Sequence, residues 1–304
     1  MTMQSYGDPE SLELTELPEP KVGPDTVLVS VRAAGVNPVD WKVAAGYLDP
    51  MLYAHFPLVP GWDVAGVVER VGADVGEFAA GDEVIGYVRR DEVQHGTYAE
   101  LVPAPVRALA RKPAALDWHQ AAGLPLAGLT ALQCLDRLAV GSGDTVLVHA
   151  ASGGVGSMAV QIAVARGARV IGTASARNHA FLRGLGAEPV AYGEGLADRV
   201  REIAPGGVGA ALDFVGGGAV ETSREVLVER DRVVSVVDHE AVAKGGHYLF
   251  VRPDPADLVT LADLADAGRL TVNVDRALPL AQAAEAWRLG QEGRTRGKLV
   301  LDVT

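Results

Sequence analysis

The stretch Asp144-Thr-Val-Leu-Val-His-Ala-Ala-Ser-Gly-Gly-Val-Gly156 decides the fold of the central part of this chain. It reads as an apolar strand that ends in a glycine turn, followed by an Ala/Val-rich helix from about Gly154 to Arg166. A second apolar strand at 168–173 would complete a βαβ unit. Free N–H groups and the positive dipole end at such a helix N-terminus bind phosphates without a lysine. The pattern therefore predicts a dinucleotide site.

The glycine turn matches two of the three glycines of the usual fingerprint, because Ala151 holds the first glycine position. Gly153 would let the backbone approach a pyrophosphate, and Gly156 would let the helix pack against the strand. An ordinary tight turn between a strand and a helix is the alternative. The expected phosphate-binding residues are consecutive: Ser152, Gly153, Gly154, Val155 and Gly156.

The end of the second strand bears on the choice of cofactor. Enzymes selective for NAD usually place an acid there, on the ribose 2′-hydroxyl, and the segment Thr173-Ala-Ser-Ala-Arg-Asn178 has none. Ser175 could donate a hydrogen bond, and Arg177 could offer its planar, charged guanidinium to a 2′-phosphate. NADPH is the predicted cofactor. Alternatively, Arg177 is a solvated charge at a helix start.

Composition narrows the classes of partner. The chain has 304 residues and a net charge of −12, which repels nucleic acid and anionic membrane surfaces. No charged leader and no run of 18 apolar residues is present, so we expect a cytoplasmic protein that does not enter a membrane.

The single cysteine, Cys134, lies in an apolar helical pattern and is predicted to pack in a core.

Two domains are predicted from a change of pattern along the chain. Residues 1–113 contain short alternating runs separated by Pro and Gly, which is typical of a β-rich domain. Residues 114–252 alternate strands with helices and predict a parallel sheet. A terminal strand at 298–302 is expected to bring 253–304 back to the first domain.

Motifs in fixed order along nearly the whole chain resemble the medium-chain dehydrogenase/reductases, in the zinc-free quinone oxidoreductase or zeta-crystallin-like branch. The resemblance implies an α/β fold with a β-rich GroES-like N-terminal domain and a doubly wound parallel-sheet (Rossmann) domain for NADPH. It also implies a homodimer. The motifs are Ala34-Gly-Val-Asn-Pro-Val-Asp40, Pro60-Gly-Trp-Asp-Val-Ala-Gly66, Gly81-Asp-Glu-Val-Ile-Gly86, Gly96-Thr-Tyr-Ala-Glu100, Leu126-Ala-Gly-Leu-Thr-Ala131, 150–156, Leu212-Asp-Phe-Val-Gly216 and Arg296-Gly-Lys-Leu-Val300.

The sequence departs from the zinc-dependent alcohol dehydrogenases at two positions. Asn37 stands where that branch has a cysteine, and Trp62 stands where it has a histidine. Neither side chain replaces a zinc ligand. No metal site is therefore predicted, and zinc-assisted alcohol oxidation is disfavoured.

The chemistry that remains is hydride transfer from NADPH to an acceptor activated by conjugation, either a quinone or the C=C bond of an α,β-unsaturated carbonyl. Two alternatives stay open. The chain could be an NADPH-binding sensor or scaffold with little catalysis, because fold alone does not fix function. It could also be a pathway-specific enoyl reductase.

The resemblance places two candidate catalytic residues in the first domain. Asn37 would lie near the nicotinamide ribose and the substrate, although an Asn before Pro38 is also typical of a turn. Tyr47 lies one residue out of register with a family tyrosine, and its phenol could donate to an enolate oxygen or simply pack on the core.

Further cofactor contacts are implied by the same resemblance, at strand ends and at the junction of the domains. Lys298 is similar to a family basic residue that reaches the phosphates, with a solvated lysine as the alternative. Asp63 and Asp213 are interpreted as structural, although Asp213 could also bind a ribose hydroxyl. The other implied contacts are Thr130, Tyr192, Phe250 and Val251. Val215 and Val237 are candidates because they fall at the carboxyl ends of predicted strands, where open parallel sheets bind ligands, with simple burial of these apolar side chains as the alternative.

Overall fold

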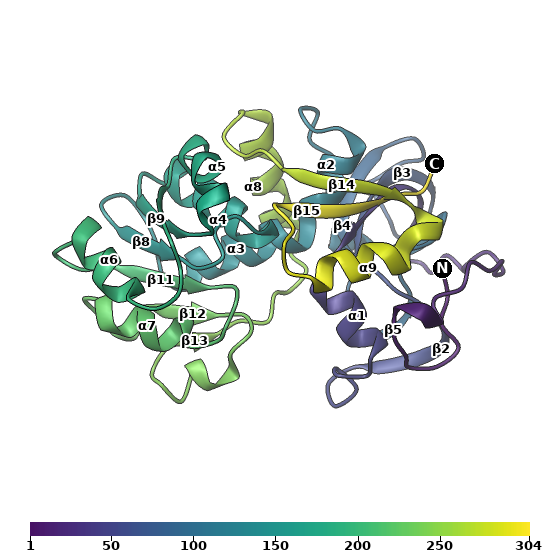
Figure 1. Ribbon diagram of the computed structural model, residues 1–304. Helices are drawn as coiled ribbons and strands as arrows, with labels where there is room; N and C mark the ends of the chain where they lie inside the picture. Colours follow the sequence, from purple (N-terminus) through teal and green to yellow (C-terminus); the bar gives the residue numbers. More distant parts are fainter. The chain divides into compact units, whose positions relative to one another are not determined.

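The computed structural model describes residues 1–304 and divides into two compact units (Figure 1). Unit 1 contains Met1–Leu129 and Arg252–Thr304, and unit 2 contains Thr130–Val251. The sequence analysis expected boundaries at 113/114 and 252/253. The difference concerns residues 114–129 and Arg252, which belong to unit 1.

A seven-stranded sheet forms the centre of unit 1. Its strand order is β14-β15-β1-β3-β4-β7, and β6 also pairs with β1. The pairs are antiparallel except β14 with β15. The strands are β1 (Thr26–Val36), β3 (Asp63–Val71), β4 (Glu83–Tyr87), β6 (Leu101–Pro105), β7 (Leu109–Arg111), β14 (Val274–Pro279) and β15 (Lys298–Asp302). Its Val- and Ala-rich sequence suits β1 for the middle of this sheet, where it is buried along most of its length.

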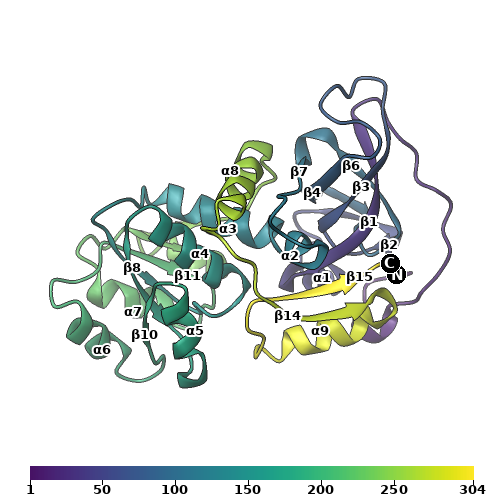
Figure 2. The ribbon, with the colours of Figure 1, turned by 90° about the horizontal axis from the view of Figure 1, so that it is seen from above.

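The last strand completes the N-terminal unit, as predicted. β15 pairs with β1, with Val300 opposite Gly35. In Figure 2 the yellow β14 and β15 lie beside the purple β1. Residues from the two ends of the sequence therefore share one hydrophobic core, which includes Val29, Trp287 and Leu301.

Short helices and a small second sheet complete unit 1. The helices are α1 (Pro38–Ala44), α2 (Trp118–Gly123), α8 (Pro255–Asp266) and α9 (Ala283–Gln291), and the small sheet pairs β2 (Tyr53–Val59) with β5 (Glu92–His95). Single 3₁₀ turns lie at Pro9–Ser11, Val106–Ala108 and Leu280–Gln282. Because α2 contacts β1, β3 and β15, residues 114–129 pack with unit 1. The longer helix α3 (Pro125–Arg137) carries the chain into unit 2.

A six-stranded parallel sheet forms unit 2, with the order β10-β9-β8-β11-β12-β13. This is the doubly wound 3-2-1-4-5-6 order of dinucleotide-binding domains. The strands are β8 (Thr145–Val148), β9 (Arg169–Thr173), β10 (Glu188–Val190), β11 (Ala210–Asp213), β12 (Val233–Ser235) and β13 (His247–Tyr248). The helices are α4 (Gly154–Ala165), α5 (His179–Gly184), α6 (Leu196–Ile203) and α7 (Ala219–Val226), with 3₁₀ turns at Ala176–Asn178 and His239–Ala241.

The buried polar and sulfur side chains of unit 2 also agree with the sequence. Cys134 is fully buried, as predicted. His149 follows β8 and is buried, with Nε2 2.8 Å from Ser223 Oγ. Burial lowers the pKa of His149 to about 4, so the ring is neutral at pH 7 and serves packing.

Candidate cofactor and active site

The glycine turn of unit 2 is held by β9, the neighbouring strand. Ala150 adopts a left-handed conformation with φ of 52°. Its N–H donates to Thr173 Oγ1 at 3.0 Å, and the N–H of Ala151 donates to the carbonyl oxygen of Thr173, also at 3.0 Å. α4 then begins after Gly153, so its first N–H groups are free of the intrahelical bonds found further along. These donors, with the helix dipole, form an anion-binding end.

Glycine is required at 156 for steric reasons. A Cβ atom there would lie 2.3 Å from the carbonyl oxygen of Ala150 and 2.7 Å from Cα of Ala151. The helix can therefore approach the turn only without a side chain at this position, which is the role the sequence predicted. Gly153 is less crowded, since its nearest neighbour would be the Ala150 oxygen at 3.3 Å. The space beside Gly153 suits the close approach of a pyrophosphate.

The structure also explains how alanine replaces the first glycine of the fingerprint. A Cβ built on Gly172, in β9, would lie 2.8 Å from the Cβ of Ala151. The side chain missing from Gly172 leaves room for the one present at Ala151, which is fully buried. The fingerprint position thus tolerates alanine because the opposing strand supplies the glycine.

Ser175 and Arg177 lie directly after β9, as predicted. Ser175 is half-buried at the start of the 3₁₀ turn, and Arg177 is exposed within it. The next residue, Asn178, is buried and donates from Nδ2 to Ser152 Oγ at 3.0 Å. This bond ties the turn after β9 to the glycine turn, so both segments hold one geometry.

Apolar side chains gather at the same edge of the parallel sheet. Tyr192 follows β10, Val215 follows β11, Val237 follows β12 and Phe250 follows β13, and their exposed fractions are 64, 59, 39 and 37 %. In a parallel sheet these carboxyl ends meet at one edge, where open α/β sheets bind ligands. Exposed apolar groups at such an edge favour a planar organic ligand.

The remaining predicted contacts of unit 2 are buried. Thr130 in α3 is 4 % exposed, and Val251 is 9 % exposed. Asp213, at the end of β11, accepts from the N–H groups of Val215 and Gly216 at 2.9 and 2.8 Å, and from Ser235 Oγ at 2.7 Å. Asp213 therefore organises the loop after β11, in line with its structural interpretation.

In unit 1, Asn37 and Lys298 lie in contact within a buried polar cluster. The Nζ atom of Lys298 donates to Asn37 Oδ1 and, at 3.1 Å, to the carbonyl oxygen of Val36. Nδ2 of Asn37 donates to Asp63 Oδ2 at 2.9 Å. Lys298 Nζ lies 3.9 Å from the same carboxylate. All three side chains are buried, so Lys298 is fully engaged inside unit 1, and its expected contact with phosphates stays a prediction.

The cluster continues into a second carboxylate. Asp40 Oδ2 accepts from the N–H of Asn37 and from the hydroxyl of Tyr98, both at 2.8 Å. The indole N–H of Trp287 donates to Tyr98 Oη at 3.2 Å. The other oxygen of Asp40, Oδ1, is buried without a hydrogen-bond partner.

Burial controls the protonation of this cluster. It raises the pKa of Asp40 to about 7 and that of Asp63 to about 6, the latter against the opposing effect of Lys298. Burial also lowers the pKa of Lys298, while both carboxylates favour its charged form. One ammonium group and two carboxyl groups thus share a site from which water is excluded.

Tyr47 lies apart from this cluster. It follows α1 in a turn, its side chain is 74 % exposed, and its N–H donates to the carbonyl oxygen of Lys42 at 3.0 Å. Tyr53, at the start of β2, is also 75 % exposed. Two phenol groups therefore face solvent from the segment that follows Asn37.

The two positions that correspond to zinc ligands hold Asn37 and Trp62, whose side chains contact other protein groups. The Asn37 amide is occupied by Asp63 and Lys298, and Trp62 is buried against Tyr87, with ring centroids 6.0 Å apart. Nowhere do three or more His, Cys, Asp or Glu side chains form a group that could hold a metal ion.

Comparison with known proteins agrees with this geometry. Residues 23–114 match the family model "Alcohol dehydrogenase GroES-like domain", and residues 185–301 match the model "Zinc-binding dehydrogenase". The chain is 32 % identical to the chloroplast envelope quinone oxidoreductase homolog of Arabidopsis thaliana, over 98 % of this chain and 96 % of that protein. It is also 32 % identical to the chloroplastic NADPH-dependent alkenal/one oxidoreductase of the same plant, over 97 % of this chain and 77 % of that protein.

A solved structure extends the similarity to three dimensions. The quinone oxidoreductase from Coxiella burnetii superposes with a TM-score of 0.90 at 34 % identity, covering all of this chain and 98 % of that one. The chain belongs to the medium-chain dehydrogenase/reductase superfamily, in its zinc-free quinone oxidoreductase branch. It is an oxidoreductase of that type, with the GroES-like and Rossmann-like domains that the sequence predicted. No helix has the length and apolar character needed to cross a membrane.

Sequence reasoning missed part of the cluster in unit 1. Asp40, Tyr98 and Trp287 were not connected to Asn37, and Asp63 was expected to be structural only. Asp40 and Asp63 did occur in the quoted family motifs. Nothing in the sequence indicated, however, that Asp40 would accept from the backbone N–H of Asn37 and Asp63 from its side-chain amide.

Proposed function

We propose that this protein catalyses NADPH-dependent reduction of quinones or of the C=C bond of α,β-unsaturated carbonyl compounds. The observation that carries the proposal is the glycine turn at the carboxyl edge of the parallel sheet, joined to a GroES-like unit whose zinc-ligand positions hold Asn37 and Trp62. The names of the relatives, quinone oxidoreductase and NADPH-dependent alkenal/one oxidoreductase, support this substrate class.

The residues of unit 2 fit a dinucleotide. The backbone of Ser152–Gly156 would hold the pyrophosphate, and the exposed apolar side chains after β10 to β13 would cover the rings. Arg177, with Ser175, would bind the 2′-phosphate that distinguishes NADPH from NADH. When bound, the cofactor supplies the hydride, and one proton completes reduction of an enone to a saturated carbonyl or of a quinone to a quinol.

The chain must also orient the acceptor and supply hydrogen bonds. Asn37 and Tyr47 remain the predicted catalytic residues, with Asn37 held rigidly by Asp63 and Lys298 and Tyr47 exposed on its turn. A fixed amide suits positioning, since such a group loses no freedom during the reaction. A phenol suits donation to a developing enolate oxygen.

The first test is anaerobic NADPH consumption by the pure protein with quinones, enals and cyclic enones. Mass spectrometry identifies the products, and NADH is run in parallel. Quinol or saturated carbonyl products would support the proposal. Tight binding of NADPH without turnover of any acceptor would instead favour a cofactor-binding protein that does not catalyse this chemistry.

The cofactor preference has a separate test at Arg177. The Arg177→Ala variant should weaken NADPH binding about tenfold, because a charge-assisted pair with the 2′-phosphate is lost, and should leave NADH binding unchanged. Arg183→Ala, an exposed arginine on α5, is the matched control and should alter neither. Dissociation constants come from fluorescence titration. An unchanged preference in Arg177→Ala would remove this residue from the site.

We also propose a homodimer, as implied by the family resemblance. Sedimentation velocity measures the mass directly, and a species of one chain alone would contradict the proposal.

A further inference from the structure

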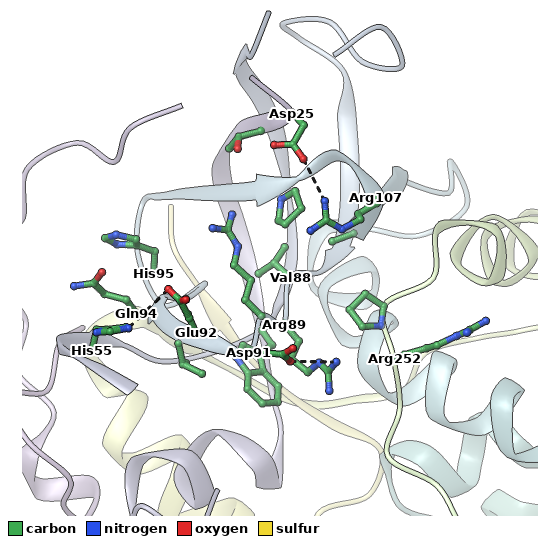
Figure 3. Close-up of a pocket in the computed structure, with 18 of the residues that line it drawn as sticks. Asp25, His55, Val88, Arg89, Asp91, Glu92, Gln94, His95, Arg107 and Arg252 are labelled. Carbon is green, nitrogen blue, oxygen red and sulfur yellow. Dashed lines mark hydrogen bonds and ion pairs between the residues drawn. The ribbon is translucent and has the colours of Figure 1, made fainter. Parts of the chain in front are cut away.

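Unit 1 contains a concave site, which we call the arginine hollow. It has a volume of about 770 Å³ and is lined by residues of the β4–β5 connection, of β5, of the Val106–Ala108 turn and of the segment that precedes α8 (Figure 3). Four guanidinium groups line it, those of Arg89, Arg90, Arg107 and Arg252. All of its lining residues belong to unit 1.

The carboxylates of the hollow are each engaged by a basic group. Asp25 lies 3.2 Å from Arg107, Asp91 lies 3.7 Å from Arg89, and Glu92 lies 3.8 Å from His55. Figure 3 shows the Asp25–Arg107 and His55–Glu92 pairs as dashed lines. Arg252 in turn lies 3.1 Å from Asp254, just outside the lining, so the guanidinium groups of Arg89, Arg107 and Arg252 each have a carboxylate partner.

Arg90 is the guanidinium group of the hollow that lacks such a partner. Its hydrogen bond to the protein runs from Nη2 to the carbonyl oxygen of Pro103 at 2.6 Å, and no carboxylate lies within ion-pair distance of it. Burial and the nearby Arg107 lower the pKa of Arg90, and Arg90 in turn contributes to lowering the pKa of His95, after burial. Asp25 opposes this lowering of the Arg90 pKa, but it does so from beyond ion-pair distance.

The walls between the arginines include apolar surface from Trp62, Val88 and Val93. A volume of about 770 Å³ lies within the usual range for small-molecule sites. The hollow therefore suits an organic molecule with an apolar body and an anionic group.

The hollow and the buried polar cluster are linked by residues that are consecutive in the sequence. Trp62 and Val88 line it, and the N–H of Val88 donates to the carbonyl oxygen of Trp62 at 2.8 Å. The residue after Trp62 is Asp63, which accepts from Asn37. One end of the hollow is thus one residue from the group that holds the predicted catalytic amide.

We propose that the arginine hollow binds an anionic group of the substrate through Arg90, so that the preferred acceptors are quinones or enones with a carboxylate or phosphate remote from the reacting carbons. This inference rests on the proposed function and narrows its substrate class. A planar guanidinium binds either anion in bidentate fashion, which a neutral ester cannot reproduce.

The test compares three enones that share one carbon chain and differ at its far end: a carboxylate, its methyl ester and a phosphate monoester. We expect kcat/KM for at least one anion to exceed that for the ester by about tenfold, mainly through KM, because the charged contact is made on binding. In Arg90→Gln the ratio of kcat/KM for the anion to kcat/KM for the ester should fall to about one or two. Arg276→Gln, an exposed arginine on β14, is the matched control and should keep the wild-type ratio.

The relative rates of the two anions distinguish a carboxylate from a phosphate ester as the natural group. Equal turnover of all three compounds by the wild type would overturn the inference, as would an unchanged ratio in Arg90→Gln. If none of the compounds is reduced, the proposed function fails for these compounds, and the inference about the hollow is then tested by binding measurements alone. Calorimetric titration would then test the hollow by itself. The inference requires that an anion binds more tightly than the ester and that Arg90→Gln removes this difference. Equal binding of anion and ester by the wild type would overturn the inference.

Discussion

Units 1 and 2 build their candidate sites from different parts of the polypeptide. In unit 2 the glycine turn offers backbone N–H groups and exposed apolar side chains, and its geometry depends on missing Cβ atoms at 156 and 172. In unit 1 the site is a buried network of charged side chains, in which Lys298, Asn37 and Asp63 contact one another. Unit 2 should therefore be sensitive to added atoms, whereas unit 1 should be sensitive to lost or altered charges.

The largest effect is expected from breaking the charged network. Lys298→Met leaves Asp63 buried with no cationic partner and should lower the free energy of unfolding by about 4 kcal/mol. The double variant Lys298→Met/Asp63→Asn removes the stranded charge as well and should recover at least half of that loss. Urea unfolding gives both values. If the losses in free energy of unfolding from the two single changes simply added in the double variant, Lys298 and Asp63 would not be coupled. The proposed difference between the charged network of unit 1 and the glycine turn of unit 2 would then fail.

A smaller effect is expected from adding one methyl group to the glycine turn. Gly156→Ala places a Cβ 2.3 Å from the Ala150 oxygen and should lower the free energy of unfolding by about 3 kcal/mol. It should also weaken NADPH binding more than tenfold, because α4 must shift away from the turn. Gly184→Ala in α5 is the control: no atom lies within 4 Å of its added Cβ, so stability should rise slightly.

Thermal unfolding and fluorescence titration measure the two effects of Gly156→Ala. If it matched Gly184→Ala in both, the close approach of helix and turn would not be what fixes this site.

The effect of pH is the smallest for a single step, one pH unit, and it too separates the units. The pKa of Asp40 is raised to about 7 by burial, so between about pH 4 and pH 7 the folded protein keeps a proton that the unfolded chain releases. This group therefore stabilises the fold most at low pH. Its contribution falls by up to about 1.4 kcal/mol per pH unit as pH rises through that window.

Asp40→Asn cannot titrate, so it should remove this part of the pH dependence. Asp74→Asn, an exposed carboxylate of unit 1, should leave the wild-type curve unchanged. The measurement is the free energy of unfolding of the three proteins from pH 4 to pH 7. Parallel curves for Asp40→Asn and the wild type would mean that Asp40 is ionised throughout the window.

The sequence predicted unit 2 more completely than unit 1. The βαβ unit, the role of Gly156 and the parallel sheet all follow from local patterns, because strand and helix periods and glycine positions are written into consecutive residues. In a parallel sheet such a pattern also fixes location, since every strand ends at the same edge. The positions of Tyr192, Val215 and Val237 at strand ends could therefore be anticipated.

The site in unit 1 could be predicted only in part. The motifs identified Asn37 and Lys298 as candidates, but not that their side chains would meet. The same motifs did not show whether Lys298 would be solvated or buried. Burial and orientation depend on neighbours from distant segments, and these are absent from any local pattern.

By itself, the sequence determined the family, the Rossmann sheet with its glycine turn, and the replacement of both zinc-ligand positions, because these features are encoded in short stretches whose geometry is local. Only the tertiary structure decided which charges are buried together and which arginine of the hollow is left without a carboxylate partner. Asn37 meets Asp63 and Lys298, and Arg90 faces Arg107, only after strands distant in sequence pair into one sheet. Electrostatic interactions depend on distance in space and on exclusion of water, and folding sets both.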